Sequence, residues 1–540
     1  MTQQLRRTFL KQGLIATGAF IPLGKVIWPQ QNSFDADRVN DTMNALTIQP
    51  FLQLAIDTAL AAGASYVDCR WTHTKERQFT SFTPRGAFVR DLEDITVGVR
   101  SLVGGYWGGS SSPVTSREEL ARLARESVAL AKAGNATGTR EVVLADRAVV
   151  TQGSWTMPVR IDPFAVHPSE IADRLGGIVV FATNLASTGV RMEANFRTQT
   201  KNFLASDGCS FSQTTYLTTG ELELIYQTEQ GQSAGVVESV TPAGVGLELF
   251  DETRLREEIR QVRETLIEDV TLPIKPVDVG RYTTLIRASG VAPIVSTTIG
   301  AATEVDRVLG HEANATGTSY LKEPREDVGT FPVGNSLLTV TGDRTMAGGA
   351  ATVQWDDEGV APEAFPLVRQ GVITDVQTNR EGAGWMRDVY ARSQSPVRSR
   401  GCAFAPNAVA PAVVHTANLR MQPATASVSE ADLLKSVNNG ILFAEFTPIL
   451  DFQQLSGYGL SRRCYDVKAG KKVARLINAG ALFRTPEFWK SVQAIGDATT
   501  AQTVGVSEGK GQPKQLSYHS VTAVPVVVKD MSVIDVLRKA

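Results

Sequence analysis

Histidine and cysteine, the side chains that most often bind transition metals, are scarce in this chain. Its 540 residues include only five histidines and four cysteines. No two histidines lie within five residues of each other, so the short histidine pair of most helical zinc sites is missing. No two cysteines form a Cys-x-x-Cys pair, and their wide spacing indicates no disulfide framework.

An excess of either charge is missing too. Lys and Arg number 54 and Asp and Glu number 56, which gives a formal net charge of −2. Nucleic-acid-binding proteins normally carry a basic excess, so the composition predicts no nucleic-acid partner. Hydrophobic residues make up 42% and charged residues 20% of the chain, which excludes disordered, collagen-like and coiled-coil proteins. The length predicts about three to four domains.

Apolar runs long enough to span a membrane are absent. The longest candidate, residues 13–23, is too short for a bilayer-spanning helix of about 20 residues. It follows Arg6 and Arg7 in segment 5–11, a pattern typical of a twin-arginine export signal. We therefore expect a signal and linker at residues 1–40, and export by this route to the periplasm or another extracytoplasmic compartment. No membrane span is expected after signal removal.

Hydrophobic periodicity predicts a protein of the α+β or mixed α/β class. Residues 45–138 are expected to form a small N-terminal α/β domain, residues 139–280 a middle α/β domain, and residues 281–540 a large β-rich C-terminal domain. Helical patterns cover residues 50–62, 117–133, 169–185, 247–269, 430–437 and 487–495. Strand-like patterns cover residues 66–71, 95–99, 337–340, 351–355, 412–414 and 524–528.

Two short motifs have the form of catalytic motifs but lack the context that the chemistry needs. His311 and Glu312 begin a His-Glu-x-x-His zinc motif, but the second histidine is absent, which favours a surface histidine or one that supports another site. Ser507 is the centre of a G-x-S-x-G pattern at 505–509. Residues 510–513 will not form the helix that must follow a nucleophile elbow, so a serine hydrolase is disfavoured.

A third motif is the run Asp356-Asp357-Glu358-Gly359. Clustered carboxylates can bind a hard cation such as Ca²⁺. More often such a run forms a solvated turn with glycine at the tight position, and this interpretation is favoured.

Several segments together match one known family in order and spacing. They are residues 62–66, 98–108, 304–310, 312–314, 317–319, 356–360 and 509–513, and the strongest reads Glu304-Val305-Asp306-Arg307-Val308-Leu309-Gly310. From about residue 55 to residue 533 the chain resembles the TldD/PmbA family, the "modulator of DNA gyrase" metallopeptidases. The resemblance implies that family's fold. It also implies that zinc-bearing members hold the metal through a His-Glu-x-x-x-His helix and a distant Cys.

The resemblance assigns the family's ligand positions to residues of this chain. The first His falls on Ser296, the Glu on Thr297, the second His on Ala301, and the Cys near Ser507. A hydroxyl is a poor zinc ligand, a methyl group is none, and threonine cannot serve as the general base. We therefore expect no confident catalytic residue, no metal and no other cofactor in this chain.

Family members without these ligands pair with a zinc-bearing subunit, and the dimer encloses a chamber for unfolded peptides. The resemblance thus implies a zinc-less subunit, with zinc in a TldD/PmbA-type partner, in a hetero- or homodimer that processes unfolded peptides. Gly310, Gly317, Thr318 and Ser319 are expected to bind an extended peptide by strand addition. Two alternatives stay open: an active peptidase with a displaced site at His311 and Glu312 or at Ser507, and a peptide-binding module without catalysis. A DNA role is not expected.

Overall fold

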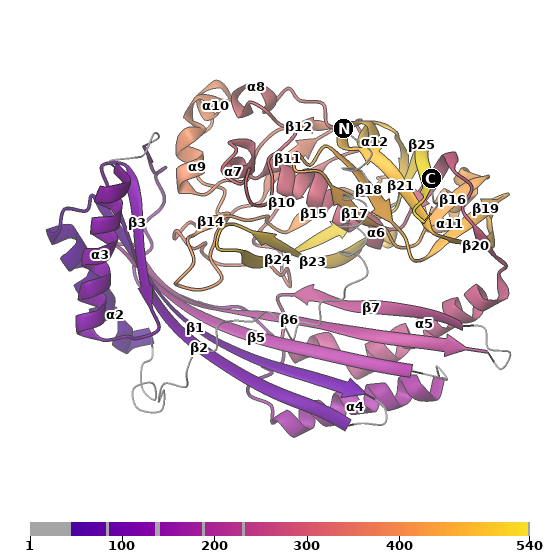
Figure 1. Ribbon diagram of the computed structural model, residues 1–540, viewed down its shortest axis with the longest axis horizontal. Coiled ribbons are helices and arrows are strands. Elements are labelled where there is room, and N and C mark those ends of the chain that lie inside the picture. The colour runs from indigo at the N-terminus through magenta and orange to yellow at the C-terminus, as the bar shows by residue number, and fades with distance from the viewer. Residues whose placement is uncertain (1–44, 83–85, 136–140, 186–188, 229–232, 538–540) are drawn as a thin grey trace. The chain divides into compact units, whose positions relative to one another are not determined.

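The computed structural model of the protein describes residues 45–82, 86–135, 141–185, 189–228 and 233–537 (Figure 1). Internal contacts divide the chain into residues 1–47 and residues 48–540. Helix α2 (Ala45–Ala61) begins just before this division, and the other described helices and strands belong to the second unit. The predicted export signal at residues 1–40 lies outside the described residues and stays a prediction.

The first half of the chain builds one large, mostly antiparallel sheet. Its strand order is β3-β2-β1-β5-β6-β4, with β7 also paired to β6, and β4 runs parallel to β6. The strands are β1 (Tyr66–Phe82), β2 (Gly86–Val103), β3 (Tyr106–Ser112), β4 (Gly153–Thr156), β5 (Gly189–Ala205), β6 (Ser210–Gln227) and β7 (Ser233–Ala243). Its helices are α3 (Arg117–Asn135), α4 (Pro168–Leu185) and α5 (Glu252–Thr271), with a 3-10 turn at Leu247–Phe250.

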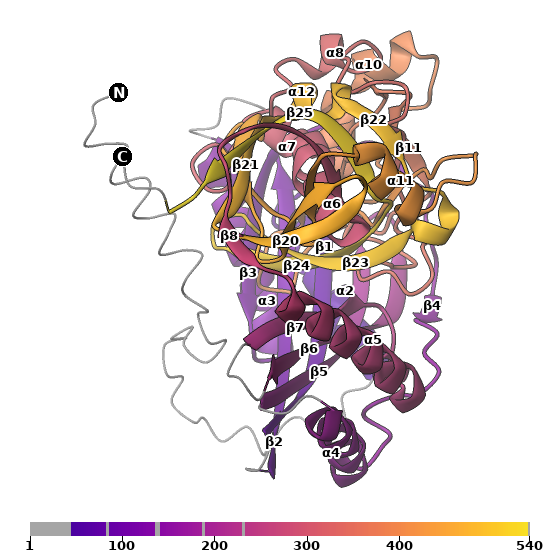
Figure 2. The same ribbon diagram turned by 90° about the vertical axis from the view of Figure 1, so that its right-hand side faces the viewer.

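The two faces of this sheet differ in chemistry because successive strand residues point to opposite sides. On β5, Phe196 packs in an apolar cluster with residues of α4 and α5, and Figure 2 shows these helices beside strands β5 to β7. The next residue, Arg197, points to the other face. There, Arg197, Gln199 and Lys201 are directed toward the C-terminal half of the chain.

The C-terminal half contains two larger sheets and one small one. A six-stranded sheet has the order β12-β11-β10-β15-β24-β23, a ten-stranded sheet has the order β17-β18-β21-β25-β9-β16-β19-β20-β8 with β22 paired to β25, and β13 pairs with β14. The strands are β8 (Ile274–Pro276), β9 (Gly280–Ile286), β10 (Val340–Gly342), β11 (Phe365–Arg369), β12 (Val372–Ile373), β13 (Ala403–Phe404), β14 (Val413–Val414), β15 (Leu419–Met421), β16 (Gly440–Phe443), β17 (Thr447–Leu450), β18 (Ser456–Leu460), β19 (Cys464–Lys468), β20 (Lys471–Ile477), β21 (Ala479–Arg484), β22 (Val492–Ile495), β23 (Gln502–Lys510), β24 (Gln515–Ala523) and β25 (Val526–Asp535).

Helix α6 (Ala288–Val295) lies in the main core of this half, where it contacts strands of both larger sheets. It is short and almost entirely apolar, so it is buried on nearly every side. The other helices here are α7 (Val305–Val308), α8 (Pro324–Asp327), α9 (Arg380–Trp385), α10 (Arg387–Arg392), α11 (Glu430–Val437) and α12 (Thr485–Lys490), with a 3-10 turn at Ala498–Thr500.

Some of the predicted elements differ from the structure. The strand predicted at 351–355 is an irregular loop, because side chains satisfy its backbone groups: Arg344 donates to the Ala351 carbonyl, and the Gln213 amide bonds both the N–H and the carbonyl of Trp355. Residues 337–339 precede β10 as loop. The helix predicted at 487–495 ends at Lys490, and its second half is strand β22.

The predicted fold class is confirmed: the protein is a mixed α/β molecule rich in sheet. Strands β1–β3 come from the segment predicted as the N-terminal domain, and β4–β7 come from the segment predicted as the middle domain, yet they share one sheet. The predicted domain boundaries themselves stay a prediction. Within the described residues, no helix combines the length and the apolar character that crossing a bilayer requires.

Candidate functional site

The predicted ligand positions 296, 297 and 301 share one helical segment in the C-terminal core. Helix α6 continues into a π-helical turn (Ser296–Gly300) and a 3-10 turn (Ala301–Thr303). The Thr297 hydroxyl donates to the Pro293 carbonyl at 2.9 Å, within its own helix. Ala301 is buried and offers no side-chain polar atom. The segment keeps its helical form without any metal-ligating side chain at these positions.

Ser296 instead bonds to a residue that the sequence analysis had only counted among the histidines. Its Oγ lies 2.9 Å from Nε2 of His519 on β24, and both side chains are buried. Burial lowers the pKa of His519 to about 4, although the charge of Glu304 opposes this shift, so the ring is neutral near pH 7. The available signal is weak: buried residues alternate along β24, and His519 falls on the inner face.

A serine beside a histidine resembles a nucleophile and its base, but two observations argue against that role. Nδ1 of His519 has no hydrogen-bond partner, so no carboxylate orients the ring as in a catalytic triad. Ser296 is 5% exposed and His519 1%, and neither lines the two cavities described below. The pair therefore joins the helical segment to β24 and does not face a substrate.

The structure does not bring Ser507 to this pair. Ser507 is exposed on β23, and its neighbour Val506 is the residue that pairs with His519 across the hairpin. Adjacent strand residues point to opposite faces, so Ser507 lies on the face away from His519. The whole G-x-S-x-G pattern lies within strand β23, and the hairpin turn, not a helix, follows. This geometry excludes a nucleophile elbow.

The residues at the four ligand positions do not fit a zinc ion. The Ser296 hydroxyl is hydrogen-bonded to His519, and the Thr297 hydroxyl is bonded within its own helix. Ser507 is exposed, and Ala301 offers only a methyl group. No group of three or more His, Cys, Asp and Glu side chains that could hold a metal occurs in the described part of the chain. All four cysteines are buried free thiols. No step of any reaction is therefore derived through a metal bound to this chain.

A buried network of charges follows directly after the helical segment. Lys510, which is fully buried, donates to Glu304 and Asp306 at 2.7 Å each and to the Val414 carbonyl at 2.6 Å. Arg307 donates to Glu304 at 2.7 Å and to Glu508 at 2.6 Å. Each buried cation thus has carboxylate partners, as burial of charge requires. The network fixes the turn after the helix to the β23–β24 hairpin.

The pKa shifts in this network divide the carboxylates into two kinds. Burial alone would raise the pKa of Glu304, but Lys510 and Arg307 outweigh it and lower that pKa to about 2. Burial and the negative charge of Glu304 raise the pKa of Glu508 to about 7, against the opposing charge of Arg307. Glu304 is therefore ionised at neutral pH, whereas Glu508 gains or loses its proton near neutral pH.

The loop expected to bind peptide uses its backbone for internal contacts. The N–H groups of Gly310, Gly317 and Thr318 donate to the carbonyls of Arg307, Glu312 and Phe452, and the last bond is 2.5 Å long. Ser319 is buried and donates through its hydroxyl to the Ala302 carbonyl at 2.6 Å. A Cβ on Gly317 would lie 2.3 Å from the Phe452 carbonyl oxygen.

These contacts give the loop a supporting role beneath the helical segment. They also leave Gly310, Gly317 and Thr318 no spare backbone donor for strand addition. The assignment of this loop to peptide binding stays a prediction, and the structure gives it no geometric support.

The acidic turn at residues 356–358 is buried, which contradicts the expected solvated turn. Asp357 accepts two hydrogen bonds of 2.8 Å from Lys201 on β5, and Glu358 accepts from Arg100 on β2. Asp356 accepts from the backbone N–H groups of Glu358, Val360 and Ala403. Burial and the charge of Glu358 raise the pKa of Asp356 to about 7. The turn is an anchor between the first sheet and the C-terminal half, with its oxygens already occupied.

His311 and Glu312 lie beside a cavity of about 400 Å³. His311 contacts the Trp385 ring edge-on at 4.8 Å, and Glu312 accepts hydrogen bonds from the Thr316 hydroxyl and the Gly511 N–H. Glu381 lines the same cavity. The bonds to Glu312 serve the protein's own loop, so the pair does not have the arrangement of a displaced zinc site.

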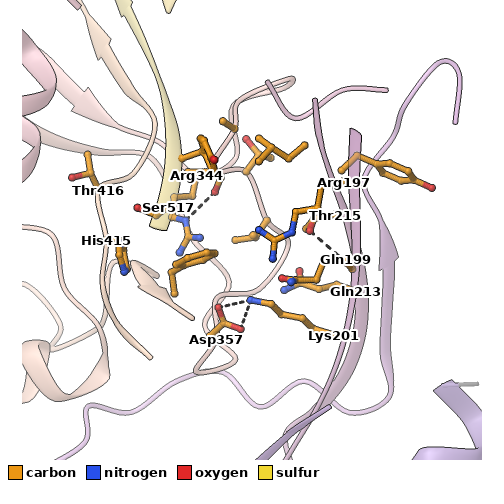
Figure 3. A pocket seen from close by; sticks show the side chains of 18 residues that line it. Arg197, Gln199, Lys201, Gln213, Thr215, Arg344, Asp357, His415, Thr416 and Ser517 are labelled. Atoms are coloured by element: carbon orange, nitrogen blue, oxygen red, sulfur yellow. Dashed lines mark hydrogen bonds and ion pairs between the residues drawn. The ribbon is translucent and has the colours of Figure 1, made fainter. Parts of the chain in front are cut away.

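A second, smaller cavity of about 70 Å³ lies between the first sheet and the C-terminal half (Figure 3). Most of its lining residues have polar side chains, but the surface they present to the cavity is mainly apolar. They come from β5, β6, the 344–357 segment, β13, the 415–416 segment and β24. The lining residues are Arg197, Gln199, Lys201, Gln213, Thr215, Tyr216, Leu217, Arg344, Ala350, Ala351, Thr352, Val353, Asp357, Phe404, His415, Thr416, Ser517 and Tyr518. Thr416 also bonds Glu304 and Glu508, so this cavity reaches the buried charge network.

Comparison with known proteins was made by sequence and by structure. A protein named as a metalloprotease from Methanocaldococcus jannaschii is 22% identical over 294 residues, which are 54% of this chain and 60% of that protein. Two crystal structures of proposed modulators of DNA gyrase share the fold. The Bacteroides thetaiotaomicron protein has a TM-score of 0.67 at 14% identity, over 92% of this chain and 100% of its own. The Thermotoga maritima protein has a TM-score of 0.68 at 15% identity, over 90% and 100%.

TldE from Thermococcus kodakarensis also shares the fold, with a TM-score of 0.65 at 11% identity over 89% of this chain and 99% of that one. Identities this low show a common fold and nothing about activity. The sequence profile of the PmbA/TldA metallopeptidase C-terminal domain matches residues 279–535, and the profile of domain 1 of the same family matches residues 89–131. These two matches cover more than half of the chain and agree with the shared fold, so the chain belongs to the PmbA/TldD family.

Proposed function

We propose that this protein is a zinc-less subunit of a PmbA/TldD-type peptidase assembly. It would supply part of the chamber wall and a surface that binds peptide, while a zinc-bearing homologue supplies the catalytic metal. The observation that carries the proposal is the helical segment 288–303, which keeps its fold although Ser296, Thr297 and Ala301 offer no zinc ligand set. The family's scaffold and a segment without a zinc ligand set at these three positions together support the proposal.

The packing around this segment supports a stable platform. Ser296 bonds to β24, and Ser319 and Tyr320 donate to the carbonyls of Ala302 and Thr298. The buried charge network then ties the end of the segment to Lys510.

Export by the twin-arginine route belongs to the same proposal. This route carries folded cargo, so two subunits that assemble in the cytoplasm can leave together. Arg6 and Arg7 support it. A reporter that depends on twin-arginine export, fused after residue 40, should reach the periplasm, and an Arg6→Lys/Arg7→Lys variant should not.

The test of the subunit role is co-purification with a zinc analysis. We expect the signal-free chain alone to hold less than about a tenth of an equivalent of zinc and to leave unfolded peptides intact. Co-expressed with a zinc-bearing homologue from the same genome, it should form a complex that cleaves them. About one equivalent of zinc in the isolated chain would contradict the proposal, as would a source genome without any zinc-bearing homologue.

A further inference from the structure

We infer that the cavity beside β5 is a carboxylate-binding subsite, which takes either the C-terminal carboxylate of a peptide or an acidic side chain. The inference rests on the proposed function, because it names the class of peptide that the subunit would hold. It rests on three observations: the charges in the cavity wall, the unused polar atoms there, and the size of the space.

The wall of the cavity has more positive than negative charge. Lys201 and Asp357 bind each other at 2.8 Å and form a neutral pair. Arg344 is 3% exposed and donates to the carbonyls of Ala351, Gly401 and Ala403, but it makes no ion pair within the described residues. The charge of Arg344 also acts on the buried carboxyl of Asp356, but that carboxyl already accepts hydrogen bonds from three backbone N–H groups. The guanidinium can therefore still attract a further anion.

Arg197 is the second cation. Its guanidinium makes one hydrogen bond, to the Pro406 carbonyl at 3.1 Å, out of the five N–H donors that arginine carries. Its nearest carboxylate, Glu76, is part-exposed and 3.5 Å away, too far for a strong pairing. Figure 3 shows the Arg197 side chain extending from β5 into the space opposite Arg344. Two guanidinium groups therefore face one cavity, and bidentate recognition of a carboxylate is what this side chain does best.

Two buried polar atoms in the wall lack partners. Ser517 is 4% exposed and His415 is 2% exposed, and among the described residues neither Ser517 Oγ nor His415 Nδ1 has a hydrogen-bond partner. Gln515 donates to the Pro411 carbonyl, so its oxygen faces His415 and accepts from Nε2, which leaves Nδ1 as an acceptor. Burial, together with Lys510, lowers the pKa of His415 to about 3, so the ring adds no charge. Ser517 can then donate to an anion, and a water molecule can satisfy Nδ1.

The space suits a small group. The cavity volume of about 70 Å³ is several times the roughly 15 Å³ that one water molecule requires. It is too small for a folded partner and large enough for the few atoms of a carboxylate. Part-exposed side chains at its rim, including Arg197 and Tyr518, allow entry from solvent.

The experiment compares three versions of one short fluorescent peptide with the full chain, by fluorescence anisotropy. The first has a free C-terminal carboxylate and no acidic side chain, the second has a C-terminal amide, and the third has the amide and one internal Glu. We expect the amide to bind about tenfold more weakly than the free acid, which is the size of one charge-assisted hydrogen bond. If the Glu peptide recovers the loss, an acidic side chain is the ligand in this subsite as well; if it does not, the chain terminus is.

Variants assign the preference to the cavity. Arg197→Gln should bind acid and amide equally, while Arg197→Lys, which keeps the charge, should keep part of the preference. Arg191→Gln is the matched control, because Arg191 lies on the same strand, pairs with Glu193 and does not line the cavity. Ser517→Ala is a second test variant, because it removes a hydroxyl donor from the cavity wall without changing the charge.

Equal binding of acid and amide by the native chain would overturn the inference and leave the peptide-binding role intact. A preference that survives Arg197→Gln would also overturn it. If no version binds, the inference falls, and co-purification of a zinc-bearing homologue still decides separately whether the subunit role holds.

Discussion

Two clusters of buried carboxylates in this protein differ in which parts of the molecule they join. The network of Glu304, Asp306 and Glu508 lies inside the C-terminal half, and its cations are Lys510 and Arg307. The acidic turn 356–358 takes its cations from the first sheet, at Lys201 and Arg100. The first cluster holds one helical segment in place, whereas the second fastens two halves of the molecule together.

The charges that follow the helical segment 288–303 are balanced by cations of the chain itself. Glu304 and Asp306 follow the helix within a few residues, yet each has a lysine as its partner. These carboxylates therefore stabilise the turn through ion pairs within the chain.

The largest effect is expected from Lys510→Met. The change removes a fully buried cation, so Asp306 keeps a hydrogen bond from the Arg307 N–H but loses its ion pair, and Glu304 keeps Arg307 and the Thr416 hydroxyl. The free energy of unfolding should fall by about 3–5 kcal/mol. Urea unfolding measures the loss. Lys514→Met on the same hairpin is the control, since Lys514 is exposed and should change stability by less than about 0.5 kcal/mol. Equal effects of the two variants would contradict the network's role.

Lys201→Met should cost less, about 2–3 kcal/mol, because Asp357 still accepts a hydrogen bond from the Ala405 N–H and lies near Arg70. Since this pair joins the two halves, the variant should also become more sensitive to limited proteolysis between them. Lys75→Met is the matched control: Lys75 lies on the neighbouring strand β1 and makes only an exposed pair with Glu93. Such surface pairs contribute about 0–1 kcal/mol.

The pKa of Glu381 is raised by carboxylates of both clusters, so this residue should make the free energy of unfolding depend on pH. Burial and the charge of Glu358 raise its pKa to about 7, and Asp306 adds to the shift. The unfolded value is about 4.3, so between these pH values the folded state binds more protons and stability falls as pH rises. Glu381→Gln keeps an acceptor for Trp107 and removes this loss.

We therefore expect the stability of Glu381→Gln to gain on the native protein by up to about 2 kcal/mol between pH 4.5 and 7.5, after allowance for partial exposure. Guanidinium unfolding at a series of pH values measures the difference. Glu363→Gln, at an exposed residue, should show no such trend. A difference that stays constant with pH would mean that Glu381 is ionised in the fold throughout.

Local signals in the sequence predicted much of the fold. The helix predicted at 430–437 matches α11, whose first turn has a capping box at Ser429 and Asp432, and α3 covers the helix predicted at 117–133. The strand predicted at 351–355 is wrong because distant side chains, not a neighbouring strand, form hydrogen bonds with the backbone there. Hydrophobic periodicity is a local pattern and does not indicate hydrogen-bond partners that are distant in the sequence.

The site was less predictable for the same reason. The positions Ser296, Thr297 and Ala301 came from the family pattern, but Ser296 and His519 are 223 residues apart and Lys510 and Glu304 are 206 residues apart. Nothing local marks such pairs. The acidic turn was misjudged as solvated because its cations, Lys201 and Arg100, belong to a different sheet.

The smallest predicted effect separates the two serines at the family's ligand positions. Ser296→Ala removes the partner of His519, whose ring then has no hydrogen bond at either nitrogen and, with its pKa lowered by burial, stays neutral near pH 7. The free energy of unfolding should fall by about 1 kcal/mol. Ser507→Ala, on the exposed face of β23, should cost less than about 0.5 kcal/mol. The resemblance assigns both to ligand positions of one metal, but the hairpin register places Ser507 on the face of β23 away from His519, the partner of Ser296. If both changes cost the same, Ser507 must share the buried surroundings of Ser296, and the two positions would again be halves of one site.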